Sequence, residues 1–263
     1  MILLKTTKLM KAFGGLIAIN KIDIEVPRGE IRGIIGPNGS GKSTFFNLIS
    51  GVYDPDPESY IEFDGHDITN EPAHEIGALG LARTFQLLRL YQDMSVINNV
   101  MSGYHTRVSY SFTEAVLGRK KIWDKEKEIK DEMMELLSFV GLADFAEMNA
   151  SELSGGQRRL LVLARAIASK PKLLMLDEPA AGLSPHNVEN LMKIIMQLKD
   201  KFGLTLIIIE HILKVVMDTC DAVTVFDHGQ KIAEGTPAKV KDDNAVIEAY
   251  LGKKMNDDEM RKA

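Results

Sequence analysis

A short apolar run stands directly before a glycine-rich loop near the start of the chain, and this pairing constrains the fold more than any other feature. A buried strand is expected over Glu30-Ile-Arg-Gly-Ile-Ile35. The loop is Gly36-Pro-Asn-Gly-Ser-Gly-Lys-Ser43, which matches G-x-x-x-x-G-K-S/T, the phosphate-binding loop of nucleotide triphosphatases. Residues 42–50 are expected to form a helix that ends at Gly51. Strand, loop and helix in this order predict an α/β fold.

The composition of the loop follows from what a phosphate group requires. Its glycines let the backbone turn its N–H groups toward phosphate oxygens, and the N-terminal end of the following helix favours anions. Lys42 is expected to reach the β- and γ-phosphates, and the Ser43 hydroxyl is expected to bind Mg²⁺. The alternative is a glycine-rich turn that binds nothing. The predicted nucleotide-binding residues of this segment are Gly36, Pro37, Asn38, Gly39, Ser40, Gly41, Lys42, Ser43 and Thr44.

Two adjacent carboxylates end a second apolar run. Residues 172–177 read as a buried strand, and Asp177 and Glu178 stand at its end. If this strand lies beside the phosphate loop, Asp177 comes near the Mg²⁺ shell. Glu178 would then be free, on the opposite face, to polarise a water for attack on the γ-phosphate. The alternative is a pair of carboxylates that only solvates the junction between strand and loop.

Another glycine pair opens a helix between these two motifs. Ser154 can cap that helix, and the glycines after it leave backbone N–H groups exposed at its positive end. A plain helix cap is the alternative, but the pattern also describes a second anion cradle without a lysine. A second cradle is useful only if two chains share one nucleotide. The residues of this motif are Leu153, Ser154, Gly155, Gly156 and Gln157.

Composition and charge exclude several other classes of protein. The 263 residues are 45% hydrophobic and 26% charged, as in soluble globular proteins, and the formal net charge of −5 argues against nucleic acid as a partner. The single cysteine, Cys220, allows no disulfide framework, is expected to be a buried filler and suits a reducing cytosol. No apolar run approaches the roughly 18–20 residues of a membrane span. The first residues lack the layout of a signal peptide.

The chain is expected to form one domain over residues 1–252. Its nucleotide-binding core would comprise residues 1–86 and 154–252, with a helical subdomain over residues 87–153 inserted between them. Residues 253–263 would be a loose charged tail.

Hydrophobic patterning supports this division. Apolar runs at 172–177 and 204–209 are typical of a parallel sheet, and residues 185–202 follow a helical pattern between them. Alternating residues at 22–26 and the run at 60–63 predict strands of an antiparallel β subdomain. The helix around residues 120–140 carries a long charged face, which is most simply a solvated surface.

In combination, these motifs resemble those of the ATP-binding cassette (ABC) ATPases, and the resemblance covers nearly the whole chain. The motif Leu153–Gln157, placed between a phosphate loop and the Asp177-Glu178 strand end, carries most of it. The resemblance implies a P-loop NTPase fold of the ABC type: a mixed or parallel sheet core, an antiparallel β subdomain and an inserted helical subdomain. It also implies ATP and Mg²⁺ as cofactors and ATP hydrolysis as the activity.

The resemblance assigns three further residues. Phe13 stands where the family places an aromatic side chain that stacks on adenine, although core packing is the alternative. Gln86 occupies the position of a glutamine that touches Mg²⁺, together with Ser43 and Asp177, and senses the membrane partner. His211 matches a histidine that contacts the γ-phosphate; a lone histidine is more often structural. The resemblance therefore implies Glu178 and His211 as the catalytic residues.

One departure from the family pattern concerns the loop after Glu178. The family often has Ser-Ala-Leu-Asp there, whereas this chain has Ala181-Gly-Leu-Ser184, so that Ser184 replaces an aspartate. That loop crosses the dimer interface in the family. The replacement is therefore expected to affect communication between the two nucleotide sites of the dimer, and it puts no catalytic residue in doubt.

The amino-acid sequences of several segments resemble those of one branch of the family, the ATPase subunits of branched-chain amino-acid importers. These segments are Arg83–Gln86, Glu178–Pro185 and Ala233–Pro237, and residues 103–123 resemble an insertion of the longer of the branch's two ATPase subunits. Urea or amide import and lipopolysaccharide export remain as alternatives within transport. A soluble ABC ATPase and a non-hydrolysing scaffold are alternatives from other classes.

This resemblance implies partners and a location. The partners would be a second ATPase chain, identical or different, transmembrane permeases and, indirectly, an external substrate-binding protein, with no nucleic acid. The chain would be cytoplasmic and peripheral on the inner face of the cell membrane. Residues 86–103 are unusually apolar for a connection, and we expect several of them to line a groove that receives a permease helix. Complete burial of these residues within the chain is the alternative.

Overall fold

The computed structural model describes residues 1–84, 90–104 and 119–250, apart from the side chains of residues 119–125. The elements in chain order are β1 (Ile2–Phe13), β2 (Leu16–Pro27), β3 (Ile31–Ile35), α1 (Lys42–Ile49), β4 (Tyr60–Phe63), β5 (His66–Asp67), α2 (Ala73–Ala78), β6 (Leu81–Arg83), α3 (Val96–Tyr104), α5 (Arg119–Phe139), η2 (Ala143–Phe145), η3 (Ala150–Glu152), α6 (Gly155–Ala168), β7 (Leu173–Asp177), α7 (Pro185–Phe202), β8 (Thr205–Ile209), α8 (Leu213–Thr219), β9 (Ala222–Asp227), β10 (Gln230–Gly235) and α9 (Pro237–Lys241).

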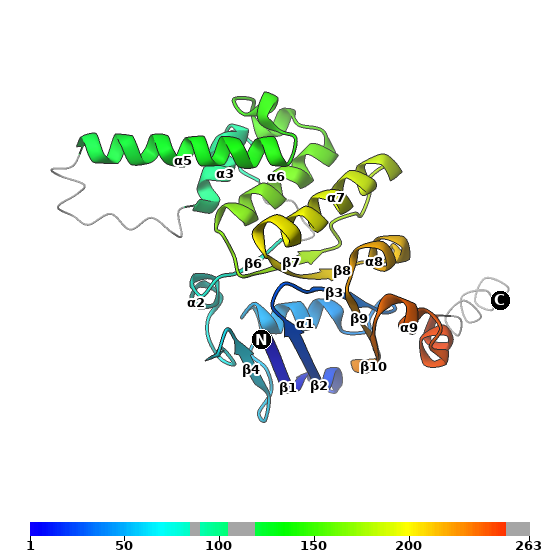
Figure 1. Cartoon of the computed structure of the whole chain (residues 1–263). Helices are drawn as coiled ribbons and strands as arrows, with labels where there is room; N and C mark the ends of the chain where they lie inside the picture. Colours follow the sequence, from blue (N-terminus) through cyan, green and yellow to red (C-terminus); the bar gives the residue numbers. More distant parts are fainter. Residues whose placement is uncertain (85–89, 105–118, 251–263) are drawn as a thin grey trace.

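The larger sheet of the described chain has the strand order β10-β9-β3-β8-β7-β6. Only β9 and β10 pair in antiparallel fashion, and every other neighbouring pair is parallel. The expected strand at residues 30–35 is β3, which is buried along its whole length. Because β3, β7 and β8 run in the same direction, the loops that follow them meet at one edge of the sheet (Figure 1).

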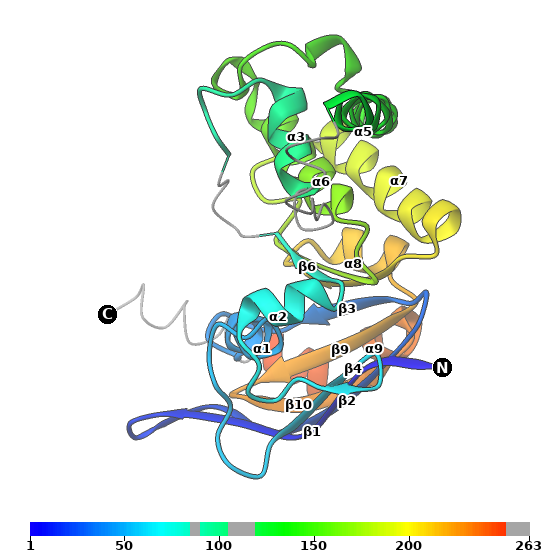
Figure 2. The same cartoon turned by 90° about the vertical axis from the view of Figure 1, so that its left-hand side faces the viewer.

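A second, antiparallel sheet has the order β2-β1-β4-β5. It contains the strands expected from residues 22–26 and 60–63, although β2 is longer than the alternating residues alone indicate. Helix α1 lies between this sheet and the larger one (Figure 2). The mixed sheet and the separate antiparallel sheet agree with the predicted α/β architecture.

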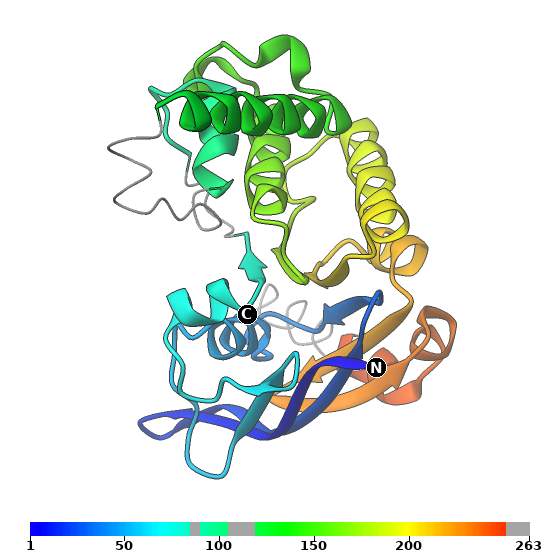
Figure 3. The same ribbon diagram turned by 60° about the vertical axis from the view of Figure 1, so that its left-hand side comes forward.

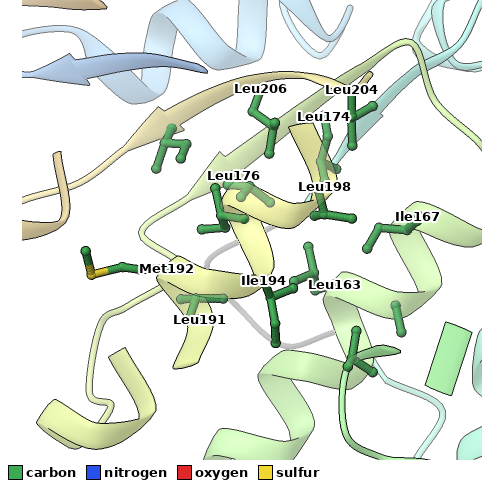
Figure 4. Packing of buried hydrophobic residues seen from close by; sticks show 14 of the residues in the cluster. Leu163, Ile167, Leu174, Leu176, Leu191, Met192, Ile194, Leu198, Leu204 and Leu206 are labelled. Carbon is green, nitrogen blue, oxygen red and sulfur yellow. The ribbon is translucent and has the colours of Figure 1, made fainter. Parts of the chain in front are cut away.

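Buried side chains alternate between the two faces of the larger sheet, as the pleat of a strand requires. Leu174 and Leu206 face a cluster that includes α6 and α7 (Figure 4), whereas Met175 and Ile207 face α1 and the antiparallel sheet. Both faces are therefore covered, which explains why residues 173–176 of β7 and 206–209 of β8 are apolar at every position rather than at alternate ones.

The helical layer covers one face of the sheet, with α5 crossing α3 and α6 (Figure 3). Helix α7 has the predicted bounds: the Ser184 side chain caps its start, and Gly203 ends it with φ +61°. Helix α3 packs so closely on α6 that a Cβ atom on Gly103 would lie 2.1 Å from the Arg165 carbonyl oxygen. The division of the chain at residue 153 stays a prediction, since the buried cluster is continuous across it.

The strand order separates the two buried strands that lead to the predicted motifs. The strand that ends in Asp177 does not lie directly beside the strand that leads to the phosphate loop, because β8 pairs with both and lies between them. The expected loose tail at residues 253–263 lies outside the described residues. Among the helices of the described chain, none is long and apolar enough to cross a membrane.

Candidate functional site

The phosphate loop follows β3, and close contacts dictate two of its glycines. Gly36 has φ +150°, and a Cβ atom there would lie 2.0 Å from the Phe226 carbonyl oxygen. Gly41 has φ +103°, and its Cβ would lie 2.6 Å from the Ala18 carbonyl oxygen. A side chain at either position would collide with the backbone. Packing as well as backbone conformation therefore requires glycine at these two positions of the motif.

The loop wraps around its own lysine. The Lys42 ammonium group donates hydrogen bonds of 2.8 Å to the carbonyl oxygens of Gly36 and Pro37, and the residue is only 6% exposed. Ser43 and Thr44 follow in the first turn of α1, where Ser43 is exposed. The positive charge is thus fixed at the centre of the loop, beside the N-terminal end of a helix.

A cavity of about 570 Å³ joins this loop to residues that are far away in the sequence. The end of β1 and the start of β2 contribute one wall, and the loops after β7 and β8 contribute Glu178 and His211. The lining residues are Phe13, Leu16, Ile17, Ala18, Asn38, Gly39, Gly41, Lys42, Ser43, Thr44, Glu178, His211 and His228. Most of the residues predicted from the sequence to bind nucleotide or to catalyse therefore share one cavity.

Phe13 lies at the mouth of this cavity rather than in the core. Its side chain is 44% exposed and meets the ring of Tyr53 edge-on, with 5.4 Å between the ring centroids. The Lys11 ammonium group lies 5.6 Å from the Phe13 centroid. This exposure contradicts the core-packing alternative and leaves an aromatic face available to a ligand.

Glu178 and His211 are in direct contact. His211 Nε2 lies 2.5 Å from Glu178 Oε1, although the residues belong to different loops. Glu178 has φ +49°, an uncommon conformation for a residue with a side chain, and its N–H donates to the Ile209 carbonyl oxygen at 2.9 Å. Strain of this kind is often found at functional sites, where the surrounding structure maintains it.

Asp177 points to a different neighbour. Its Oδ2 accepts a hydrogen bond of 3.0 Å from Arg83 Nη2, and both side chains are largely buried. The same guanidinium donates to Asn47 Oδ1 on α1 at 2.7 Å and, at 3.0 Å, to Oγ of Ser50, the C-cap residue of that helix. Arg83 thus ties the carboxylate to the helix that follows the phosphate loop. The sequence did not single out Arg83 for this role, because no local pattern indicates which carboxylate an arginine will meet.

The motif at residues 153–157 lies apart from this cavity. Ser154 caps α6 as predicted: its Oγ accepts from the Gln157 N–H, while Gln157 Oε1 accepts from the Ser154 N–H. Ser154 and Gly155 are exposed, and no member of the motif lines the cavity of its own chain. Gln86 lies outside the described residues.

Two residues near the cavity, His228 and Tyr250, were not assigned to the site from the sequence. His228, in the turn between β9 and β10, lines the cavity, and the Gly229 N–H beside it donates to the Ser40 carbonyl oxygen at 3.1 Å. Burial raises the pKa of the Tyr250 phenol, and a hydrogen bond from the Gly36 backbone opposes that rise. These contacts join residues about 200 positions apart, so only the assembled sheet could reveal them.

Two family models match the chain. The model described as "ABC transporter" matches residues 19–181, and the model described as "Branched-chain amino acid ATP-binding cassette transporter" matches residues 230–254.

Individual proteins are similar over almost the whole chain. The probable branched-chain amino acid transport ATP-binding protein LivG of Archaeoglobus fulgidus is 41% identical over 254 residues, 95% of each chain. The high-affinity branched-chain amino acid transport ATP-binding protein BraF of Pseudomonas aeruginosa is 36% identical over 250 residues, which are 95% of this chain and 98% of the relative.

Solved structures are similar to the same extent. The crystal structure of a nucleotide-free ATP-binding cassette from an ABC transporter superposes with a TM-score of 0.81 at 36% identity, covering 95% of this chain and 99% of the other. The ADP conformation of an ATP-binding cassette of an ABC transporter gives 0.83 at 36% identity, covering 96% and 99%.

Proposed function

The chain belongs to the ABC transporter family of ATP-binding subunits, and from this premise we propose that it is the ATP-hydrolysing subunit of an importer for branched-chain amino acids. The family confirms the predicted ABC fold and makes the chain an ATPase. The observation that carries the proposal is the cavity that joins Phe13, the phosphate loop, Glu178 and His211. The match of residues 230–254 to a model of branched-chain amino acid cassettes supports the choice of cargo.

The nucleotide would lie along this cavity. The exposed ring of Phe13 would stack on the adenine at one end. The phosphates would lie over the loop, where Lys42 and the backbone N–H groups neutralise their charge. Lys42 would exchange its bonds to the carbonyl oxygens of Gly36 and Pro37 for bonds to the phosphates.

The residues present fit a magnesium ion. The Ser43 hydroxyl lines the cavity, and Arg83 fixes the Asp177 carboxylate relative to α1. Within the described chain no cluster of three or more histidine, cysteine or carboxylate side chains could hold a metal. Mg²⁺ usually takes only one or two protein ligands beside phosphate oxygens and water. Ser43 and Asp177, with Gln86, would hold the ion, which would offset phosphate charge.

Glu178 would act as the general base. Its carboxylate would take a proton from a water molecule as the water oxygen bonds to the γ-phosphorus and the bond from that phosphorus to the ADP oxygen breaks. His211, 2.5 Å from this carboxylate, would orient it and also contact the γ-phosphate. The pair lies on the wall of the same cavity as Lys42, which is where the γ-phosphate would be.

Each site would be completed by a second chain. Ser154 and Gly155 expose the N-terminal end of α6, a helix of 14 residues, away from the cavity of their own chain. Their N–H groups and hydroxyl could reach a γ-phosphate only across an interface between chains. We therefore propose that two cassettes bind ATP between them.

A groove beside β6 would receive a permease. It has a volume of about 540 Å³ and is lined by Leu90, Tyr91, Gly103 and Arg165, among others. Tyr91 is 56% exposed, and its backbone N–H and carbonyl oxygen are both bonded to the side chain of buried Asn99. The groove wall is therefore fixed in position, although it remains accessible.

The apolar residues expected to line this groove divide between it and the core. Val96 and Ile97 are buried in the core, whereas Leu90 and Tyr91 line the groove. Leu87 and Leu88 lie outside the described residues. A short cytoplasmic helix of a permease is the occupant that we propose.

The Glu178→Gln variant tests the activity. Glutamine keeps the shape of the side chain but cannot take the proton, so ATP hydrolysis should fall about 10²–10⁴-fold while ATP binding is retained. The measurements are steady-state ATPase rates and equilibrium binding of ATP. Lys42→Ala is the matched control, because it should lose binding as well. Unchanged hydrolysis in Glu178→Gln would contradict the assignment of the base.

Reconstitution tests the cargo. The chain would be co-expressed with candidate permeases and a candidate binding protein from the same organism, and uptake of labelled leucine, isoleucine and valine would be measured in vesicles, with Glu178→Gln as the inactive control. ATP-dependent uptake of these amino acids is expected. Uptake of urea or an amide instead, or lipopolysaccharide export, would support the alternatives within transport.

A further inference from the structure

A buried carboxylate connects the two loops that carry Glu178 and His211. Glu210 directly follows the last residue of β8 and is only 2% exposed. Its Oε1 accepts a hydrogen bond of 2.7 Å from the Ala180 N–H. Its Oε2 accepts from the N–H groups of His211 at 3.1 Å and Ile212 at 3.4 Å. One side chain therefore binds the loop after β7 with one oxygen and the loop after β8 with the other.

These two loops are the ones whose relative position matters for the reaction. Ala180 follows Glu178 by two residues, and His211 is itself one of the residues bound. The Glu178 and His211 side chains meet at 2.5 Å, and this contact requires both loops to keep their register. The hydrogen bond from the Glu178 N–H to the Ile209 carbonyl oxygen fixes the start of the loop after β7. The bond from the Ala180 N–H to Glu210 adds a second connection two residues further along this loop.

A carboxylate at this position is costly, and its surroundings show how it is maintained. Burial raises the pKa of Glu210, and the nearby charge of Glu178 raises it further, whereas the three backbone N–H donors lower it. A buried carboxylate is tolerated when its oxygens are hydrogen-bonded. Ionised, it can accept bonds on both oxygens. A glutamine at position 210 has only one acceptor oxygen. Its side-chain NH₂ group would face the backbone N–H groups of one of the two loops, and the hydrogen bonds to that loop would be lost.

We propose that Glu210 is a positioning residue, which locks the loop after Glu178 to His211 so that the base and the histidine reach the γ-phosphate as one unit. The inference rests on the proposed function, since it takes Glu178 as the base. Glu210 itself touches no substrate in this scheme and acts only through the two loops. Loss of the lock should therefore slow the chemical step and leave nucleotide affinity unchanged.

The Glu210→Gln variant tests the proposal. The kcat for ATP hydrolysis should fall about tenfold or more, because small misplacements of reacting groups are expensive, while the Kd for ATP stays within about twofold. Hydrogen exchange at the amides of Ala180 and His211 should become faster. Asp221→Asn is the matched control: Asp221 Oδ2 also accepts a backbone N–H bond, from Ile31 at 2.7 Å, but at the opposite end of β3. It should lower thermal stability without lowering kcat.

Glu178→Gln is measured in parallel to separate the two claims. If the wild-type chain does not hydrolyse ATP, the proposed function fails; if Glu178→Gln hydrolyses ATP normally, Glu178 is not the base and the premise of the lock fails. If it does not, but Glu210→Gln keeps the wild-type kcat and amide protection, only the lock is contradicted. Glu210→Met, which buries no polar side-chain atom, is a second variant; a folded Glu210→Met with the wild-type kcat overturns the proposal. Unfolding of both variants would assign Glu210 a structural role and would overturn it equally.

Discussion

Single glycines of the phosphate loop are required for different physical reasons. Gly36 and Gly41 combine a positive φ with a backbone oxygen in the place that a Cβ atom would take. Gly39 also has a positive φ, +79°, but nothing lies within 4 Å of its Cβ position. The first two therefore meet a steric limit, whereas Gly39 meets only a conformational preference. The motif does not distinguish these cases, but substitutions can.

Gly36→Ala should damage the protein far more than Gly39→Ala. The alanine at 36 would force Phe226 and the loop apart, at a cost of about 3 kcal/mol in unfolding free energy, and should reduce ATP affinity more than tenfold. The alanine at 39 should cost about 1 kcal/mol. Denaturant unfolding and ATP binding measure both effects. Equal losses in the two variants would show that the contact with the Phe226 carbonyl oxygen is not limiting.

Among the elements, β3 carries an unusual residue for a buried strand. Arg32 is 4% exposed and is ion-paired with Glu30 and Glu234, while its Nη1 also donates to Thr224 Oγ1 at 3.1 Å. Another donation, from Nη2 to the Glu25 carbonyl oxygen, connects β3 to β2. This polar cluster therefore joins a strand of the larger sheet to a strand of the antiparallel sheet. Its charges should make the stability of the fold depend on pH.

Glu234 should contribute to stability at neutral pH and lose that contribution in acid. Burial disfavours its ionisation, but hydrogen bonds from Lys231 and Arg32 and the charges of both outweigh burial and lower the pKa of Glu234 below its ordinary value. A carboxylate whose pKa is lowered in the folded state stabilises the fold at pH values above its pKa in the unfolded chain. This stabilisation is lost as the pH falls through the pKa of the folded state. Because the group is partly solvated, we expect about 1 kcal/mol.

The Glu234→Gln variant measures this contribution. The free energy of unfolding of the wild-type chain should fall more steeply than that of the variant as the pH is lowered from about 5 to 3. Glu62→Gln, which removes a carboxylate on β4, is the control and should leave the acid limb nearly unchanged. Parallel curves for wild type and Glu234→Gln would contradict the assigned direction of the pKa shift.

At the scale of the whole molecule, the parts of the proposed ATP site are divided between two surfaces. The cavity with Lys42, Glu178 and His211 is one, and the exposed start of α6 is the other. The groove at Tyr91 is a third surface, on the helical side of β6. Under the proposed function, the chain would present one surface to nucleotide, one to a second cassette and one to a permease, and substitutions can disable each of them separately.

Mixing two inactive variants tests whether sites are shared in a homodimer. Lys42→Ala removes the phosphate-binding lysine, and Ser154→Arg blocks the start of α6. In a mixed dimer one site combines two intact halves, so equal amounts should recover about a quarter of the wild-type ATPase rate, because half of the dimers are mixed. A mixture of Lys42→Ala with the double variant has no intact site and should stay inactive. No recovery from folded, dimerising variants would contradict sharing.

A charge in the groove should separate hydrolysis from transport. Tyr91→Glu leaves the basal ATPase rate within about twofold, since nearby Arg165 can neutralise the new carboxylate, but it should abolish membrane association and transport. Burial lowers the pKa of Arg165, so it is a desolvated cation that gains from such a partner. Met196→Glu on α7 is the control, since Met196 is 44% exposed and lies outside the groove. Normal transport by Tyr91→Glu would place the permease elsewhere.

The sequence by itself determined the parts of this protein that depend on neighbouring residues. The succession of β3, the phosphate loop and α1 is readable because glycine spacing, apolar runs and helix caps are local signals. The bounds of α7 and the cap at Ser154 could be predicted for the same reason. Ser184, which replaces the expected aspartate, likewise caps α7 with its own side chain.

Only the tertiary structure decided which of these parts meet. The strand β8 lies between β3 and β7, which no pattern within either strand indicates. Arg83 joins Asp177 to α1, and Glu210 joins the loop of Glu178 to that of His211. Asn47 and Asp177 lie 36 and 94 positions from Arg83, and Ala180 lies 30 positions from Glu210. Such contacts depend on the pairing of strands across the whole sheet, and the energy of that pairing is spread over many buried residues. Local sequence therefore specifies the residues of the proposed site, while the sheet determines their geometry.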